Sequence, residues 1–346
     1  MESAILVGTR ALDELRELAT SAGARIIDEV IQRRERPDPA TFIGKGKVEE
    51  LREKVLEEGV DVVIFDEELS PSQAKNLEEA LETKVVDRTG LILDIFARRA
   101  RTKEGKLQVE LAQLEYRLTR LTGHREYLSR LGGGIGTRGP GETKLEMDRR
   151  QIRHRISTLK RDIEQIRKHR QLHRERRRRD QLPLVSLVGY TNAGKSTLFR
   201  ALSKENTLVS SRLFSTLDTL IRRIQLGRSF PILISDTVGF IRKLPHQLVS
   251  AFRATLEEVV EADLILHVID VSDPDHDEKR QVVLEVLKDI GAGDHQMLTV
   301  YNKADLLEHG ESVDISDGEV LVSAATGEGL DRLLSEIVHL VSPVRV

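Results

Sequence analysis

The sequence predicts an α/β protein in which two α/β domains are joined by an antiparallel coiled-coil hairpin of two helices. Three observations support this fold class. Short apolar runs alternate with amphipathic stretches over residues 1–103, leucines and isoleucines recur at heptad spacing over 104–180, and apolar strands that end in glycine, aspartate or asparagine recur over 181–346. A chain of 346 residues is long enough for two or three domains with cores of their own.

The composition of the chain excludes several classes of protein. There is no cysteine, which excludes disulfides and thiolate metal sites and indicates a reducing compartment. No apolar run approaches the ~20 residues of a membrane span, and the amino terminus lacks the basic and then apolar pattern of a signal peptide. We therefore expect a soluble, cytoplasmic protein. We also expect it to be a monomer.

The amino-terminal domain, residues 1–103, is expected to contain a small parallel sheet because its predicted strands and helices alternate along the chain. Ser70 and Pro71 favour a helix start, since serine caps a helix and proline fits its first turn. The basic loop of residues 33–36 and 44–47 either contacts phosphate or is a solvated connection, and it lacks the complete pattern of a phosphate-binding loop. The predicted strands are 5–8, 24–27, 60–65 and 84–87, and the predicted helices are 12–19, 48–57, 70–81 and 91–100.

The middle segment, residues 104–180, spaces its apolar positions alternately by four and three residues, with one missed position at Arg149. Two such stretches with a reversal between them predict an antiparallel coiled coil whose apolar side chains pack between the helices. The reversal holds six glycines from Gly132 to Gly141 and cannot bury enough apolar surface to order itself. The heptad positions are Leu107, Leu111, Leu114, Leu118 and Leu121 in the first helix and Leu145, Ile152, Ile156, Leu159, Ile163 and Ile166 in the second.

Charge is spread unevenly along the chain. The net charge is −3, but residues 149–179 hold fourteen Lys and Arg against three Asp and Glu, an excess of +11, so the remainder sums to −14. This asymmetry indicates a polyanionic partner such as RNA, the alternative being a solvated helix face. Around the glycine-rich reversal, Arg130, Arg138 and Lys144 are candidate contacts for RNA phosphates and bases, the alternative being a flexible linker.

The third domain, residues 181–346, begins with an apolar run that leads into a glycine-rich loop. Its glycines let backbone N–H groups curl around phosphates, while Lys195 reaches the β- and γ-phosphate oxygens and Ser196 ligates Mg²⁺. The loop therefore predicts binding of a nucleoside triphosphate. It reads Gly189, Tyr190, Thr191, Asn192, Ala193, Gly194, Lys195 and Ser196.

A second motif, Asp236-Thr237-Val238-Gly239, follows the apolar strand 231–235. Asp236 is expected to hold Mg²⁺ through a water molecule, and the Gly239 amide to contact the γ-phosphate. The segment between this motif and the glycine-rich loop must supply a hydroxyl that ligates Mg²⁺ and senses the γ-phosphate, and both Thr216 and Thr219 are candidates.

The base is predicted by Asn302-Lys303-Ala304-Asp305, which follows the apolar strand 297–301. The Asp305 carboxylate accepts hydrogen bonds from guanine N1–H and the 2-amino group, whereas it would face a lone pair on adenine N1. GTP is therefore the expected nucleotide. Asn302 is expected to brace the loop, Lys303 to cover the purine, and the backbone amides of Ser323, Ala324 and Ala325 to contact guanine O6.

Phe240 stands where many GTPases place a glutamine that orients the attacking water. Phenylalanine cannot bond to that water, so no catalytic side chain is certain, and intrinsic hydrolysis is expected to be slow. Asn192 is a candidate ligand for a K⁺ ion beside the phosphates, the alternative being that it caps its own loop.

These motifs, and above all the string from Leu131 to Thr143 at the hairpin reversal, resemble the HflX family of translation-factor-related GTPases, from the amino-terminal domain to about Val341. The resemblance implies a Ras-like G domain after the amino-terminal domain and helical hairpin. By position it also selects Thr216 over Thr219 as the Mg²⁺-ligating threonine. Ser215 stands where alanine is usual in the family. Many members also continue past the position of Val346 into a small carboxy-terminal domain, and we predict no contact by such a domain. The matching GTP-contacting segment is Phe214, Ser215, Thr216, Leu217 and Asp218.

The function that this resemblance implies is that of a GTPase that binds the large ribosomal subunit and its RNA and splits or rescues stalled ribosomes. Two alternatives remain open. One is an assembly GTPase of the large subunit, and the other is a GTP-gated adaptor whose hairpin recruits a protein partner.

Overall fold

The computed structural model describes residues 1–33, 36–131, 140–179, 182–204, 213–214, 219–226, 230–243, 253–307, 316 and 318–342. The chain forms two compact units. The first contains Met1–Arg98 and Lys106–Glu164, and the second contains Arg99–Gly105 and Gln165–Val346. The two long helices of the middle segment each contribute to both units, and the predicted domain boundaries stay a prediction.

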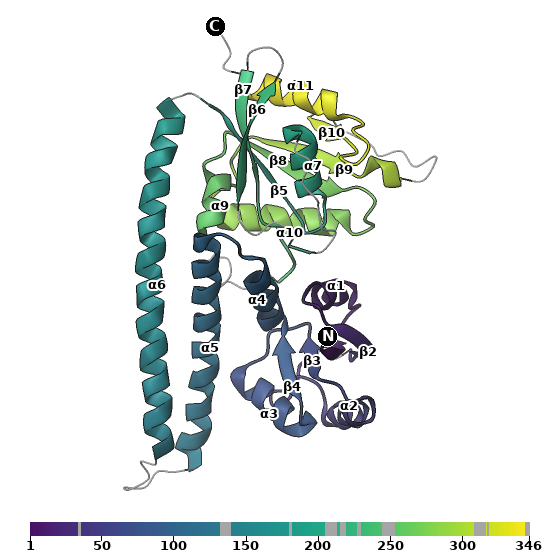
Figure 1. The fold of residues 1–346 in the computed structure, drawn as a ribbon. Helices are drawn as coiled ribbons and strands as arrows, with labels where there is room; N and C mark the ends of the chain where they lie inside the picture. The colour runs from purple at the N-terminus through teal and green to yellow at the C-terminus, as the bar shows by residue number, and fades with distance from the viewer. Residues whose placement is uncertain are drawn as a thin grey trace. The chain divides into compact units, whose positions relative to one another are not determined.

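The first unit contains a four-stranded sheet with the strand order β2-β1-β3-β4, in which all neighbours are parallel (Figure 1). Parallel strands need crossover connections, and the alternating helices supply them. The α/β class predicted for this part of the chain is confirmed, although β2 is longer than expected. The strands are β1 (Ser3–Gly8), β2 (Arg25–Ile31), β3 (Val62–Phe65) and β4 (Lys84–Asp87), and the helices are α1 (Asp13–Ser21), α2 (Lys45–Glu58), α3 (Pro71–Leu81) and α4 (Arg88–Arg99).

The start of α3 follows from its capping residues. The Gln73 backbone N–H donates to Ser70 Oγ at 3.2 Å, and the Ser70 backbone N–H donates to Gln73 Oε1 at 3.0 Å. This capping box satisfies two N–H groups that a helix start leaves unpaired. The helix therefore begins at Pro71, as Ser70 and Pro71 predict.

Two long helices, α5 (Lys103–Leu131) and α6 (Pro140–Arg179), lie side by side (Figure 1). Within the first unit they are joined by ion pairs between Arg155 and Glu110 at 2.7 Å and between Lys160 and Glu115 at 2.8 Å. The Arg149 guanidinium also donates to the backbone carbonyl of Leu121 at 2.7 Å. The reversal at residues 132–139 lies outside the described residues, and the coiled-coil character of the pair stays a prediction.

Asp87, at the end of β4, fastens α5 to the sheet. Its buried carboxylate accepts hydrogen bonds from the Tyr116 hydroxyl at 2.6 Å and from Arg120 Nη2 at 2.8 Å. Burial, together with the neighbouring carboxylate of Asp87, raises the pKa of Tyr116 above its usual value. The Tyr116 hydroxyl therefore stays protonated and donates to Asp87 throughout the physiological pH range.

The second unit contains a six-stranded sheet with the strand order β10-β9-β8-β5-β7-β6. Every neighbouring pair is parallel except β6 and β7, which are antiparallel. The strands are β5 (Leu184–Gly189), β6 (Leu220–Leu226), β7 (Phe230–Asp236), β8 (Leu264–Asp270), β9 (Met297–Asn302) and β10 (Glu319–Leu321), and the helices are α7 (Lys195–Ser203), α9 (Arg253–Val260), α10 (His276–Asp289), the 3₁₀ helix η1 (Ala304–Leu306) and α11 (Leu330–Val341).

The apolar core of the second unit lies between this sheet and the helices α7 and α11. Phe199 of α7 and Ile337 of α11 are buried against alternate residues of the central strands, such as Leu187 and Leu266. This packing fixes the strand ends, from which the functional loops emerge. Among the described residues, no helix is both long and apolar enough to cross a membrane.

Candidate nucleotide-binding site

The predicted motifs of the second unit lie at the carboxyl ends of its strands. They begin at or just after the last residues of β5, β7, β9 and β10. All these strands run parallel, so their carboxyl ends meet at one edge of the sheet. Open α/β sheets bind their ligands at this edge.

The glycine-rich loop between β5 and α7 has a backbone that only glycine fits at two positions. A Cβ at Gly189 would lie 2.2 Å from the Val268 carbonyl oxygen, and a Cβ at Gly194 would lie 2.2 Å from Asn302 Nδ2. Gly194 also has a φ of +89°, in the left-handed region. The loop therefore reaches the start of α7 in a turn that presents backbone N–H groups to an anion.

Lys195 is the cation of this loop and is buried. Its Nζ donates to the backbone carbonyls of Gly189 at 3.0 Å and Tyr190 at 2.7 Å. Burial lowers the pKa of Lys195 to about 8, while the Asp236 carboxylate acts in the opposite direction. An anionic phosphate beside Nζ would stabilise the charged form, so the lysine is suited to bind one.

Ser196 and Asp236 form the oxygen pair expected of a Mg²⁺ site. Ser196 Oγ donates to Asp236 Oδ2 at 2.7 Å, which brings the start of α7 to the end of β7. Mg²⁺ prefers oxygen ligands and is commonly held by one or two protein groups together with phosphates and water. The hydroxyl and carboxylate fit this cation, and no group of three or more His, Cys, Asp or Glu in the described part of the chain offers an all-protein alternative.

The residues after Asp236 pack directly on the glycine-rich loop. A Cβ at Gly239 would lie 3.0 Å from Lys195 Nζ, so the Gly239 backbone borders the place where a γ-phosphate is expected. Phe240 is fully buried; its N–H donates to the Gly189 carbonyl at 3.1 Å, and its carbonyl accepts from the Thr191 N–H at 2.7 Å. The Phe240 side chain points into the core and offers no group to a water molecule.

Asn302 connects three loops of the site. Its Nδ2 donates to the Ala193 carbonyl at 3.0 Å, and its Oδ1 accepts from the Ala324 backbone N–H at 2.9 Å. The side chain is 2 % exposed, and both of its polar ends are satisfied. The phosphate loop, the end of β9 and the loop after β10 are therefore held in one fixed arrangement.

The two charged residues after Asn302 are also held in place. Lys303 has a φ of +68°, and its Nζ forms an ion pair with Asp270 Oδ2 at 2.5 Å. The exposed Asp305 accepts a hydrogen bond from Ser323 Oγ at 2.5 Å through one carboxylate oxygen. The other carboxylate oxygen of Asp305 has no hydrogen-bond partner among the described residues and can accept from the donors of a guanine edge.

Part of the predicted site falls outside the described residues. Among the GTP-contacting candidates this applies to residues 215–218, including Thr216, whereas Phe214 is described and buried. Thr219 has a buried hydroxyl for which the described part of the chain offers no hydrogen-bond partner. The side chains of Arg130, Arg138 and Lys144 are likewise outside the description.

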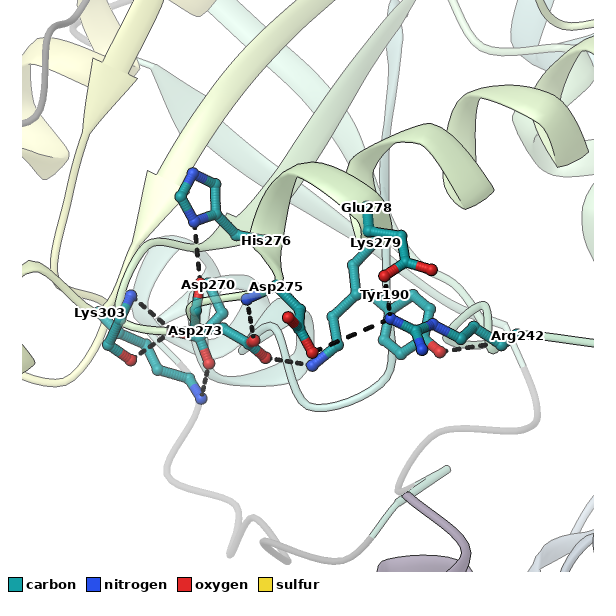
Figure 2. A network of polar contacts seen from close by, with 10 residues as sticks. Tyr190, Arg242, Asp270, Asp273, Asp275, His276, Glu278, Lys279 and Lys303 are labelled. Atoms are coloured by element: carbon teal, nitrogen blue, oxygen red, sulfur yellow. Dashed lines mark hydrogen bonds and ion pairs between the residues drawn. The ribbon is translucent and has the colours of Figure 1, made fainter. Parts of the chain in front are cut away.

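Sequence reasoning missed a network of charged groups between β8 and α10, which Figure 2 shows. Asp270 accepts from Ser272 Oγ at 2.6 Å in addition to its ion pair with Lys303. Arg242, which follows the Asp236–Gly239 motif, forms an ion pair with Glu278 at 2.7 Å. The signal for Asp270 was available, because it ends a buried strand as Asp236 and Asn302 do.

The fold and the site define a P-loop GTPase that carries an additional amino-terminal domain. Three family models match the chain in order. "GTP-binding GTPase N-terminal" matches residues 9–97, "GTP-binding GTPase Middle Region" matches 99–177, and "50S ribosome-binding GTPase" matches 184–303.

Curated relatives identify the family. The chain is 56 % identical over 326 residues to the GTPase HflX of Caldanaerobacter subterraneus, which covers 94 % of this chain and 76 % of the relative. It is 47 % identical over 336 residues to the GTPase HflX of Escherichia coli, which covers 96 % of this chain and 79 % of the relative. The chain belongs to the HflX family of GTPases, and GTP hydrolysis is its reaction.

Solved structures agree with this assignment. A crystal structure of SsGBP with GDP covers 100 % of both chains at 25 % identity and a TM-score of 0.54. A GTP-binding protein from Sulfolobus solfataricus in complex with GDP covers 99 % of both chains at 25 % identity and a TM-score of 0.51. The α/β fold with a P-loop domain and an amino-terminal domain is therefore confirmed.

Proposed function

We propose that this GTPase binds the RNA of the large ribosomal subunit and couples GTP binding and hydrolysis to the splitting or rescue of stalled ribosomes. The match to a 50S ribosome-binding GTPase model supports the choice of partner. The absence of cysteine suits action in the cytoplasm, and we expect a monomer.

The observation that carries this proposal is a face of α6 whose cations form no ion pair with a carboxylate of the described residues. Arg150, Arg153 and Arg161 are exposed, and none has an ion-pair partner among the described residues. At 3.6 residues per turn the three lie within about 80° of arc and span about 17 Å of the helix. We name Arg150, Arg153 and Arg161 the basic stripe.

Other cations of α6 are occupied within the first unit. Arg155 and Lys160 pair with Glu110 and Glu115 of α5, and the buried Arg149 donates to a backbone carbonyl. The excess of positive charge in the sequence is therefore divided between groups that hold the two helices together and groups that face solvent. The second set suits a phosphate backbone, because arginine binds phosphate with a planar fork of donors.

The nucleotide cycle follows from the site. Ser196, Thr216 and, through water, Asp236 would hold Mg²⁺, which neutralises charge on the phosphates when bound. The Gly239 amide would detect the γ-phosphate, so that GTP and GDP place the following segment differently. Because Phe240 is buried, the ribosome must supply or position the group that orients the attacking water.

We propose a monovalent cation, K⁺, as a second ion of the site beside Mg²⁺. Asn192 is exposed within the phosphate loop, has a φ of +64°, and has no side-chain hydrogen bond among the described residues. That leaves its carbonyl oxygen available as a K⁺ ligand, whereas a capping role would have occupied it.

The decisive experiment is to pellet the protein with purified large subunits in the presence of a non-hydrolysable GTP analogue or of GDP. We expect binding with the analogue, weak binding with GDP, and a manyfold stimulation of GTP turnover by large subunits. Deleting Gly132–Gly141 should remove most of the stimulation while leaving nucleotide affinity unchanged. Equal turnover with and without ribosomes would refute the proposal.

Two other outcomes would redirect it. Accumulation of precursor particles, rather than stalled ribosomes, on depletion of the protein would favour an assembly role for the same GTPase. Binding that is insensitive to salt and goes to a protein rather than to RNA would favour a GTP-gated adaptor.

A further inference from the structure

In the second unit, a hydrogen bond connects the phosphate loop, residues 189–196, to the segment after Gly239. The GTPase site described above gives this bond no role. The Tyr190 hydroxyl accepts a hydrogen bond from the Arg242 backbone N–H at 2.8 Å. Tyr190 is the second residue of the phosphate loop, and Arg242 lies three residues beyond Gly239. A side chain of the phosphate loop is therefore hydrogen-bonded to the segment that is expected to contact the γ-phosphate.

The Arg242 side chain anchors the same segment to α10. Its Nη2 forms an ion pair with Glu278 at 2.7 Å and lies 3.9 Å from Asp275 (Figure 2). With the backbone bonds of Phe240 to Gly189 and Thr191, this gives residues 240–242 fixed contacts on two sides.

Tyr190 is itself held by its surroundings. The residue is 7 % exposed, and Lys279 Nζ lies 5.5 Å from the centroid of its ring. Lys279 is in turn paired with Asp273 in the loop before α10. The ring is thus confined between the phosphate loop and α10, and this holds the hydroxyl in position to accept from the Arg242 N–H.

We infer that Tyr190 and Arg242 are positioning residues that fix the Gly239 amide for the γ-phosphate and so set the preference for GTP over GDP. The argument rests on the GTP site described above. Only GTP carries the γ-phosphate that Gly239 detects, so a contact that orders Gly239 acts on GTP affinity and leaves GDP affinity unchanged.

The test is Tyr190→Phe in the full chain, because this change removes one hydroxyl and keeps the ring. Affinities for fluorescent GDP and for a fluorescent non-hydrolysable GTP analogue are measured in Mg²⁺. We expect analogue affinity to fall about two- to ten-fold, the worth of one hydrogen bond, and GDP affinity to change little. Arg242→Gln should act in the same direction but more weakly, because its partner Glu278 is exposed.

A matched control is Tyr301→Phe. The Tyr301 hydroxyl also bonds to α10, where Arg280 donates to it at 3.3 Å, but it has no bond to residues 239–242. This variant should keep the wild-type ratio of the two affinities. Equal losses of analogue and GDP affinity in Tyr190→Phe, or no loss of either, would overturn the inference. Failure of the wild-type protein to bind GDP would instead refute the site itself.

Discussion

The basic stripe on α6 permits a comparison of two double variants that have the same net charge but lack different cations. Replacing Arg150 and Arg161 by glutamine removes two exposed cations that have no ion-pair partner among the described residues. Each phosphate contact contributes about 0.9 to the slope of log affinity against log salt on duplex nucleic acid, so two contacts contribute about 1.8. If the variant and the wild type bind equally at about 1 M salt, where such contacts are screened, this slope gives a loss of affinity of roughly 60-fold at about 0.1 M salt.

The assay is binding to purified large subunits with a GTP analogue, from about 50 to about 200 mM salt, the range over which phosphate contacts weaken steeply. The control is the double variant Arg155→Gln and Lys160→Gln, which changes the net charge by the same amount on the same helix. These two cations are already paired with Glu110 and Glu115. The control should therefore lose much less affinity and keep a slope close to that of the wild type.

Equal losses in the two double variants would show that only net charge matters and would refute the reasoning from free and paired cations. An unchanged salt slope in Arg150→Gln and Arg161→Gln would show that the stripe does not contact phosphate. Nucleotide affinity serves as the check on folding, since both variants lie outside the GTP site and should bind GDP as the wild type does.

Four further outcomes follow from the nucleotide site. Asp305→Asn should lower GDP affinity about a hundred-fold or more, because an amide cannot accept both guanine donors, and competition with xanthosine diphosphate should show the preference moving to that base. Since burial lowers the pKa of Lys195 to about 8, the nucleotide-free protein loses this cation above that pH, and GDP affinity measured across this range should fall as pH rises; Lys195→Gln should flatten the profile. Replacing K⁺ by Na⁺ should slow turnover in the wild type but not in Asn192→Ala, and an unchanged wild-type rate would dismiss the ion. Phe240→Gln should destabilise the protein without raising its intrinsic rate, as measured by denaturant unfolding and single-turnover hydrolysis.

Most of the α/β fold could be predicted from local patterns. The strand-and-helix alternation of the first unit and the strand ends of the second are short-range signals, because an apolar run and the residue that ends it are neighbours in sequence. Asp236 and Asn302 were found in this way. Asp270 also ends a buried strand and could have been predicted in the same way. Its ion pair with Lys303 could not, because no sequence motif indicates it.

Contacts between distant segments were beyond sequence reasoning. Asp87 receives a hydrogen bond from Tyr116, and Arg242 donates to Tyr190, across separations of 29 and 52 residues. No periodicity links such partners, since each depends on where a helix packs on a sheet. The division of the α6 cations into those with and those without an ion-pair partner in the described part of the chain is of the same kind, because it depends on which carboxylates α5 presents.

The burial of Phe240 explains why restoring a glutamine should fail. The side chain is fully buried, and the backbone on either side of it is bonded to Gly189 and Thr191. A glutamine there would bury an amide and remove a buried aromatic ring, at a cost of about 2 to 5 kcal/mol in the free energy of unfolding. The stimulation proposed above is therefore expected to come from a group outside this position. A rise in intrinsic turnover of ten-fold or more in Phe240→Gln, about 1.4 kcal/mol of barrier, would contradict this account.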